Sequence, residues 1–263
     1  MTVSEIADRG VLYYPDLAGK VAVVTGGSRG IGAATCRALA SNRVRVAVNG
    51  RDRDAISAVV AQITDAGGVA IAVPGDVTDV AVVAGMRDTI TDEYGPVDIL
   101  AAFAGGQGAP MVTAQLGADR WRTVIDSELT SMYLTVTAFL PAMMARGRGV
   151  IITMSSMAGR QPTQANAAYA AAKAGVAMFS RHLANEVGGA GVRVNCLSPA
   201  AVLNDQMRQH MSTEELDGLA RSFPLGRIGR PEDIAAAALY LASSASSWIT
   251  GVTLDITGGR AIA

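Results

Sequence analysis

The sequence predicts a doubly wound α/β fold, in which helices cover both faces of one parallel sheet of seven strands. Short apolar runs alternate with segments of helical periodicity along almost the whole chain. This alternation is typical of parallel sheets that are buried on both faces. A glycine-rich turn also joins the first apolar run directly to a helical segment. In open sheets of this class, ligands bind at the carboxyl ends of the strands.

Seven apolar runs are the expected strands, and the segments between them are the expected helices. The strands are predicted at residues 20–25, 45–48, 69–73, 97–103, 149–154, 192–197 and 252–256. The helices are predicted at 33–40, 54–66, 80–94, 119–145 and 232–243, with another after the fifth strand. We expect a loose N-terminal arm at residues 1–18 and a single domain over residues 19–263, because no repeat or linker interrupts the chain.

Composition argues against several classes of function. The net charge of −1 and the lack of a basic block argue against nucleic acid as a partner. Cys36 and Cys196 lie far apart without metal-like spacing, so we expect buried, reduced thiols and no metal site. We find no signal-like segment and no apolar run long enough to span a membrane, and therefore expect a cytoplasmic protein without membrane partners.

The glycine-rich turn, residues 26–32, follows the first strand and precedes the first helix. Glycine lets the backbone bend tightly and approach a pyrophosphate, while the helix N-terminus offers free N–H groups. In this context the turn predicts a dinucleotide phosphate site. Asp76, Gly105 and Ser156 follow later strands and are expected at the same edge of the sheet.

Tyr169 and Lys173 are four residues apart, so they lie on one face of a predicted helix. An ammonium group beside a phenol favours the phenolate and so makes a phenol a better acid and base at neutral pH. Ser156, at the end of the fifth strand, supplies a hydroxyl that can hold a substrate oxygen against the tyrosine. The three residues outline an acid/base site.

Together these motifs resemble the short-chain dehydrogenase/reductase family, and most of all its branch of 3-oxoacyl-carrier-protein reductases. The matching motifs are Thr25-Gly-Gly-Ser-Arg-Gly-Ile-Gly32, Asp76-Val77, Ser156, Tyr169-x-x-x-Lys173, Asn195-x-x-x-Pro199, Gly229-Arg-Pro-Glu-Asp233, Trp248-Ile-Thr-Gly251 and Asp255 with Gly258-Gly259. The resemblance implies a Rossmann-type fold and an NAD(P)-dependent oxidoreductase acting on ketones or secondary alcohols. It also implies that Tyr169 protonates the carbonyl oxygen, Ser156 orients that oxygen, and Lys173 assists the tyrosine and binds the nicotinamide ribose.

The resemblance further implies the positions that contact the cofactor. They are Gly26, Ser28, Arg29, Gly30, Ile31, Gly32, Arg51, Asp76, Val77, Ala104, Gly105, Tyr169, Lys173, Pro199 and Val202. NAD-preferring members carry an acidic residue after the second strand, where this chain has Gly50 followed by Arg51. Arg29 and Arg51 suit a 2′-phosphate, so we expect NADPH in preference to NADH. Asp52 is placed to pair with Arg51, which would weaken that preference.

Glu128 departs from the family pattern most sharply. It replaces the asparagine that ties a water chain to the catalytic lysine. Val124, Met132 and Thr135 share its helical face, so we expect the carboxylate to point inward. We interpret Glu128 as a fourth catalytic residue that binds the water chain and couples electrically to Lys173, and the alternative is a glutamate without a role.

Two other departures lie in loops beside the expected cofactor site. Phe103 replaces an asparagine after the fourth strand, so either the strand end is braced differently or the ring packs beside the cofactor. A simple packing substitution is an equal alternative. Ala200 and Asn204 replace the usual glycine and threonine after the sixth strand, which leaves the path of that loop open.

The segment from about 200 to 225 is the expected substrate lid. Its apolar residues among polar ones suit an amphipathic flap over a partly apolar substrate, and its apolar members are Met207, Met211, Leu216, Leu219 and Phe223. Gln107, Met111, Met157 and Gln164 are candidate pocket residues, whereas His182 and His210 are expected to be structural or solvated. The family resemblance implies a homotetramer or homodimer that forms through the long helices and the last strand.

The sequence is compatible with three functions. The first is an NADPH-dependent ketoreductase or alcohol dehydrogenase. The second keeps the site but reduces an imine or enone, or runs a dehydratase or cyclase reaction without net redox change. The third is a nucleotide-binding sensor without catalysis, which the acid/base set of Ser156, Tyr169 and Lys173 disfavours.

Overall fold

The computed structural model describes residues 12–260, and its strands form one parallel sheet. The strand order is β3-β2-β1-β4-β5-β6-β7, and every neighbouring pair is parallel. The strands are β1 (Val21–Thr25), β2 (Arg45–Gly50), β3 (Val69–Pro74), β4 (Ile99–Ala102), β5 (Gly149–Met154), β6 (Val192–Pro199) and β7 (Thr253–Ile256). The predicted seven-stranded, doubly wound sheet is therefore confirmed. The strand order reverses between β1 and β4, and ligands bind at such switch points in open α/β sheets.

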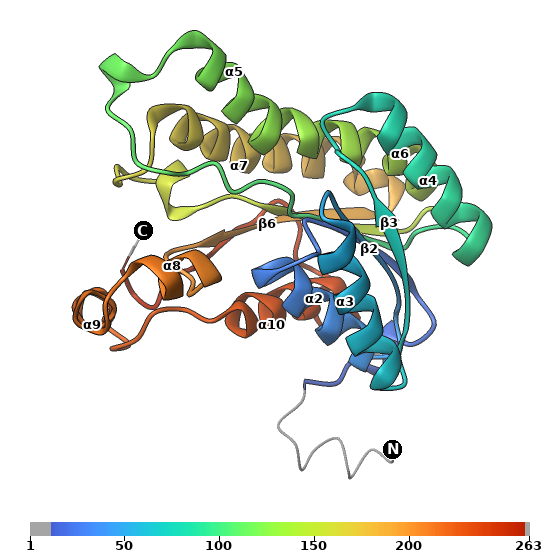
Figure 1. The fold of residues 1–263 in the computed structure, drawn as a ribbon. Helices are drawn as coiled ribbons and strands as arrows, with labels where there is room; N and C mark the ends of the chain where they lie inside the picture. The colour runs from blue at the N-terminus through green and yellow to red at the C-terminus, as the bar shows by residue number, and fades with distance from the viewer. Residues whose placement is uncertain (1–11, 261–263) are drawn as a thin grey trace.

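Helices cover both faces of the sheet (Figure 1). The helices on one face are α4 (Val80–Tyr94), α5 (Ala118–Ile125), α6 (Ser131–Ala145) and α7 (Ala167–Val187), and those on the other are α2 (Gly30–Ser41), α3 (Arg53–Asp65) and α10 (Pro231–Ala242). Each face has its own buried apolar cluster, one built with α4, α6 and α7 and the other with α2, α3 and α10. Short 3-10 turns are η1 (Pro15–Leu17), η2 (Thr113–Gln115), η4 (Met157–Gly159), η5 (Gly188–Ala190) and η6 (Ser244–Ser246). Within residues 12–260, no helix has both the length and the apolar composition to cross a membrane.

The helix predicted at 119–145 is interrupted by one turn of π-helix, η3 (Asp126–Thr130). The backbone N–H of Ser131 donates to the carbonyl of Asp126, five residues back, instead of to Ser127. The hydroxyl of Ser131 donates to the Ser127 carbonyl at 2.7 Å in its place. Such turns occur frequently at functional sites, and this one contains Glu128.

Part of the predicted N-terminal arm is packed, which corrects the expectation for residues 12–18. Leu17 is fully buried. The N–H of Tyr14 donates to Asn42 Oδ1 at 2.7 Å, and Asp16 accepts the N–H of Ser244 at 2.8 Å. These contacts join distant segments, so local periodicity gives no sign of them. Residues 1–11 lie outside the described part of the chain.

The predicted lid contains two short helices, α8 (Asp205–His210) and α9 (Thr213–Arg221). Asn204 caps α8 through the N–H of Met207 at 2.9 Å, and Ser212 forms a capping box with Glu215 at the start of α9. Phe223, just after α9, is buried, and the polar residues of both helices face solvent. These two helices agree with the amphipathic flap expected for this segment, and their caps Asn204 and Ser212 mark where each helix begins.

Candidate active site

The glycine-rich turn lies at the switch point between β1 and β4, and its shape requires glycine. Gly26 has φ +67°, and a Cβ there would lie 3.0 Å from the carbonyl oxygen of Phe103. A Cβ on Gly32 would lie 2.1 Å from the carbonyl oxygen of Gly26, so turn and helix pack without room for a side chain. Helix α2 begins at Gly30, and Arg29 before it makes no side-chain cap. The first N–H groups of α2 therefore remain free for a pyrophosphate, which these residues fit.

Thr25 braces the end of β4, where the family asparagine is replaced. Its Oγ1 accepts the N–H groups of Phe103 and Ala104 at 3.0 and 3.2 Å. The Phe103 side chain is partly buried against the apolar cluster on the α2 and α10 face. The structure thus shows that Thr25 braces this strand end and that the Phe103 ring packs in the fold.

The three predicted acid/base residues come from two neighbouring elements. Ser156 lies two residues after the end of β5 and caps η4, where its Oγ accepts the N–H of Ala158 at 3.2 Å. Tyr169 and Lys173 lie on α7, with Lys173 Nζ 5.4 Å from the centre of the tyrosine ring. The neighbouring Ser155 donates to the Lys173 carbonyl at 2.7 Å. This bond joins the serine segment to the tyrosine helix.

Lys173 and Glu128 form a buried ion pair. Nζ of the lysine lies 2.8 Å from Oε2 of Glu128, and the two side chains are 4% and 0% exposed. Nζ also donates to the carbonyl of Met154 at 2.8 Å. Burial works against the charge, but the Glu128 carboxylate and the nearby Tyr169 outweigh it, so the pKa of Lys173 is raised above its ordinary value. Glu128 points inward, as expected, and its carboxylate contacts the lysine directly.

The other carboxylate oxygen of Glu128 binds the turn that follows β4. Its Oε1 accepts the backbone N–H groups of Gly106 and Gln107, both at 2.6 Å. Gly105, with φ +149°, leaves space for the carboxylate, because a Cβ there would lie 2.3 Å from Oε2. The sequence predicted Gly105 as a cofactor contact but gave no sign of this contact with Glu128.

Asn166 is a site residue that the sequence analysis missed. It is buried and caps α7 by accepting the N–H of Tyr169 at 2.9 Å. Its Nδ2 donates to the carbonyls of Gln107 and Ala109 at 2.8 and 3.0 Å. The only local signal is an asparagine three residues before Tyr169, which is the spacing of a helix N-cap.

The residues predicted to select the cofactor form two exposed ion pairs. Arg29 Nη2 lies 2.7 Å from Asp52 Oδ2, and Arg51 Nη1 lies 3.7 Å from Asp76 Oδ2. The sequence-based expectation that Asp52 pairs with Arg51 is therefore wrong, because Asp52 pairs with Arg29 in the glycine-rich turn. A Cβ on Gly50 would lie 3.2 Å from the Ser28 side chain, so an acidic residue there would be crowded.

The remaining predicted residues are more loosely connected to this centre. Val202 bridges to Gly229, at the base of the lid, and Val77 is buried beyond β3. Among the predicted pocket residues, Gln107 and Met157 are partly buried, whereas Met111 and Gln164 are exposed. His182 and His210 are also exposed. In residues 12–260, no three His, Cys, Asp or Glu side chains are grouped as metal ligands.

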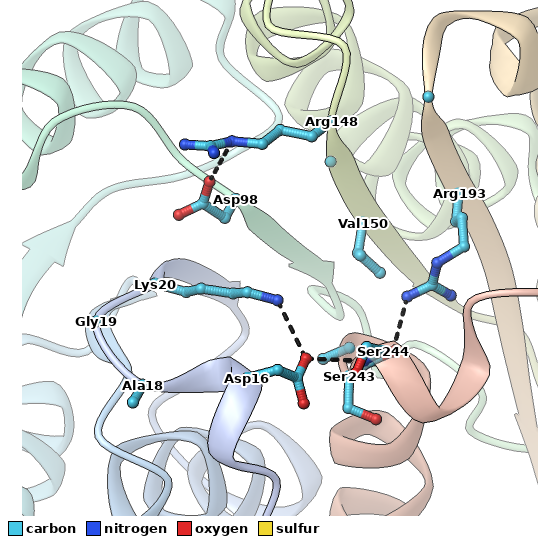
Figure 2. Close-up of a pocket in the computed structure, with 13 residues that line it drawn as sticks. Asp16, Ala18, Gly19, Lys20, Asp98, Arg148, Val150, Arg193, Ser243 and Ser244 are labelled. Carbon is cyan, nitrogen blue, oxygen red and sulfur yellow. Dashed lines mark hydrogen bonds and ion pairs between the residues drawn. The ribbon is translucent and has the colours of Figure 1, made fainter.

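A cavity of about 470 Å³ lies at the opposite edge of the sheet, where the strands begin. Figure 2 shows the residues that line it. Its acidic groups already have partners: Lys20 lies 3.4 Å from Asp16, and Arg148 lies 3.7 Å from Asp98 (Figure 2). Arg193 donates to backbone carbonyls at the end of α10. None of the predicted catalytic or cofactor residues lines this cavity, so it is separate from the candidate active site.

The fold and the site together assign the protein to a class, that of the dinucleotide-binding oxidoreductases with a doubly wound sheet. A family model described as Enoyl-(Acyl carrier protein) reductase matches residues 26–261. The 3-oxoacyl-(acyl-carrier-protein) reductase FabG of Chlamydia muridarum is 35% identical over 246 residues, which cover 93% of this chain and 98% of the relative. The D-threitol dehydrogenase of Mycolicibacterium smegmatis is 37% identical over 247 residues, 94% of each chain.

A solved structure has the same fold. It is a 7α-hydroxysteroid dehydrogenase complexed with NADH and 7-oxo glycochenodeoxycholic acid, with a TM-score of 0.88 and 32% identity, covering 94% of this chain and 96% of that one. The protein belongs to the short-chain dehydrogenase/reductase family, with FabG-like relatives, as the sequence motifs predicted. It is accordingly an NAD(P)-dependent oxidoreductase of the class that acts on carbonyl and hydroxyl groups.

Proposed function

We propose that the protein is an NADPH-dependent ketoreductase or alcohol dehydrogenase with Tyr169 as its general acid and base. The observation that carries this proposal is the buried Lys173 ammonium, held 5.4 Å from the Tyr169 ring at the carboxyl edge of the sheet. The bound nicotinamide supplies or accepts the hydride at the carbonyl carbon. In reduction, Tyr169 gives its hydroxyl proton to the carbonyl oxygen, which yields the alcohol.

The other three catalytic candidates act on this proton transfer. Ser156 hydrogen-bonds the same carbonyl oxygen and so fixes the direction in which the carbonyl carbon faces. Lys173 holds a positive charge beside Tyr169, which favours the phenolate when the proton has left. Glu128 keeps Lys173 in place and charged, as the 2.8 Å ion pair supports.

The proposed cofactor contacts begin at the glycine-rich turn and end at the lid. The pyrophosphate lies on the turn and the start of α2, where free N–H groups and tight glycine packing support it. Asp76 and Val77 follow β3, and Ala104 and Gly105 follow β4 on the same edge. Pro199 at the end of β6, with Val202, holds the amide end of the nicotinamide beside the lid.

The preference for NADPH rests on Arg29 and Arg51. Each arginine is paired with a carboxylate, but both pairs are highly exposed and such pairs are weak. A 2′-phosphate offers these guanidinium groups a stronger, bidentate partner. No acidic side chain occupies position 50 to accept from a ribose 2′-hydroxyl. NADH remains the competing cofactor, because the exposed Asp52 and Asp76 both lie close by.

The substrate is a ketone or secondary alcohol with an apolar portion. Partly buried apolar side chains lie along helices α8 and α9 and between them; they are Met207, Met211, Leu216 and Leu219. Such a flap excludes water from the hydride transfer. An acyl thioester, a polyketide-like ketone and a cyclic diketone all fit this description. Reduction of an imine or enone, and a dehydratase or cyclase reaction, use the same acid/base set and are the alternative reactions.

A homotetramer is the proposed assembly, with a homodimer as the alternative. Apolar side chains are exposed in two regions, one on the long helices and one around β7. Those on the helices are Tyr133, Met144 and Met178, and those around β7 are Trp248, Val252 and Leu254. Trp248 is 98% exposed, which is unusual for so large a side chain unless another subunit covers it. We also propose a cytoplasmic location, in keeping with the unpaired, buried Cys36 and Cys196.

A ketone panel with NADPH tests the function. The wild type is expected to consume NADPH, followed by its absorbance, with at least one ketone. The Tyr169→Phe variant is expected to bind NADPH equally but to lose nearly all turnover. Undiminished turnover in that variant contradicts the role of Tyr169. Nucleotide binding without turnover of ketones, imines or enones by the wild type supports the sensor alternative.

A further inference from the structure

The carboxylate of Glu128 lies against three donor groups. Oε1 accepts the N–H groups of Gly106 and Gln107, and Oε2 faces the ammonium of Lys173. Glu128 is buried, so water does not replace any of these partners. A carboxylate satisfies three donors with its two acceptor oxygens, whereas an amide would turn its own NH₂ group toward a donor. The surroundings therefore require the acid and not its amide.

This carboxylate connects three elements that are far apart in the sequence. Glu128 lies in the π-turn η3, Lys173 on α7, and Gly106 in the turn after β4. The same turn is tied from its other side by Asn166, whose Nδ2 donates to the carbonyls of Gln107 and Ala109. Both the turn and the lysine thus depend on the position of one side chain.

The turn also forms a wall beside the catalytic tyrosine. A Cβ on Gly108 would lie 3.2 Å from two ring atoms of Tyr169. Asn166 accepts the backbone N–H of Tyr169 at 2.9 Å, so the turn and the tyrosine share a second connection. Movement of the turn would therefore change the space in front of the tyrosine ring.

Lys173 is held by two contacts at its Nζ. Nζ donates to the Met154 carbonyl at 2.8 Å and forms an ion pair with Glu128 Oε2, also at 2.8 Å. The other titratable groups that face Lys173 are Tyr169 on its own helix and Cys196 on β6. Burial raises the pKa of the Cys196 thiol, so Glu128 supplies the negative charge beside the lysine at neutral pH.

We propose that Glu128 is a positioning residue that locks the turn at 105–109 to Lys173, so that one carboxylate fixes the wall beside Tyr169 and holds the charge and direction of the lysine. Only the expected effect of Glu128 on turnover rests on the proposed function. The locked turn itself is a property of the folded chain and is measured without cofactor or substrate.

Hydrogen exchange at the turn tests the lock directly. In Glu128→Gln, the amides of Gly106 and Gln107 face an NH₂ group or lose their acceptor, and their exchange is expected to be at least about tenfold faster than in the wild type. Asp126→Asn is the matched control, because Asp126 lies in the same π-turn but is exposed. Its exchange at the turn is expected to equal that of the wild type. Unchanged exchange in Glu128→Gln overturns the proposal.

The pH profile tests the second half of the proposal. Without Glu128, burial of Lys173 lacks an opposing charge, so the lysine is expected to lose its proton at a lower pH. The alkaline decline in the turnover of Glu128→Gln should therefore begin at a lower pH than in the wild type. Its kcat should be roughly 10²-fold below that of the wild type, which is the loss that a 1 Å misplacement can cause. If the alkaline limb of Glu128→Gln is identical to that of the wild type, Glu128 does not hold the charge of Lys173 and the second half of the proposal is overturned.

Glu128→Asp provides a second variant in case the glutamine variant does not fold. It keeps the charge beside Lys173 but is shorter by one methylene, so it cannot reach all three donors. We expect faster exchange at Gly106 and Gln107 with the alkaline limb retained. Exchange as slow as in the wild type would contradict the lock. If no ketone is reduced by any version of the protein, the proposed function fails, while the exchange comparison still decides this inference.

Discussion

Asn166 caps the helix that carries Tyr169, with its Oδ1 2.9 Å from the tyrosine backbone nitrogen. The same side chain donates through Nδ2 to two carbonyls of the turn after β4. One amide group therefore sets the start of α7 and the position of that turn together. Because an amide offers both donors and an acceptor, asparagine meets both needs and neither aspartate nor serine does.

Replacing this asparagine is expected to affect stability and turnover together. Asn166→Ala loses an N-cap and two partly buried hydrogen bonds, so the free energy of unfolding should fall by roughly 2–4 kcal/mol. Asn204→Ala is the matched control, because Asn204 caps α8 in the same way but is exposed and bonds no second segment. Its loss should be about 1 kcal/mol. Urea unfolding compares the two, and equal losses would mean that the bonds to the turn add nothing.

Gly105 and Gly106 form a second matched pair. Both have positive φ, but only a Cβ at Gly105 would meet Glu128, at 2.3 Å from Oε2. Gly105→Ala and Gly106→Ala should each incur backbone strain of about 1–3 kcal/mol. Turnover should fall much further in Gly105→Ala, because the methyl group displaces the carboxylate from Lys173. Steady-state kinetics on both variants check this, and equal kcat values would contradict it.

Arg51 is expected to contribute to the choice of cofactor. Charge-assisted hydrogen bonds contribute about 1.5–3 kcal/mol, so the kcat/KM ratio of NADPH to NADH should fall roughly 10- to 100-fold in Arg51→Ala. Arg53→Ala, which removes a neighbouring exposed arginine outside the predicted contacts, should leave the ratio near that of the wild type. If the kcat/KM ratio of NADPH to NADH does not change in Arg51→Ala, Arg51 does not select NADPH and the proposed cofactor preference loses its support.

Asp233, which follows the lid, is expected to make the stability of the fold depend on pH. Two nitrogens of Arg227 donate to its carboxylate, and these bonds lower the pKa of Asp233 below its ordinary value of 3.8. A depressed carboxyl pKa stabilises the fold above the ordinary value and ceases to do so as the pH falls through the native value. Asp233→Asn should therefore melt at a lower temperature than the wild type at pH 7, and the gap should close below pH 3.8. A gap that stays constant down to acid pH would show that the ionised carboxylate is not responsible.

The raised pKa of Lys173 predicts that the fold loses stability as the pH rises, whereas the lowered pKa of Asp233 predicts a loss as the pH falls. A lysine whose native pKa lies above 10.5, its ordinary value, stabilises the fold below that pH and ceases to do so as the pH rises through the native value. Lys173→Met removes this contribution, and the melting temperatures of the two proteins should converge above pH 10.5. Thermal unfolding from neutral to alkaline pH checks it.

Sequence periodicity was sufficient for the fold, since each buried strand and each amphipathic helix has a local pattern. The expected strand at 149–154 and the helix at 80–94 match β5 and α4 residue for residue. Family membership followed from motifs whose order and spacing are themselves properties of the chain. The inward direction of Glu128 was also predictable, because helical spacing places it with Val124 and Met132.

The sequence alone therefore determined the seven strands, the helices that cover them and the motifs that carry the resemblance. Tertiary structure alone decided which groups meet: Glu128 with the Gly106 amide, Asn166 with Gln107, and Asp52 with Arg29. Each of these contacts joins residues more than twenty positions apart, and local propensity carries no information at that distance. Only the packing of helices against the sheet brings such groups within hydrogen-bond reach.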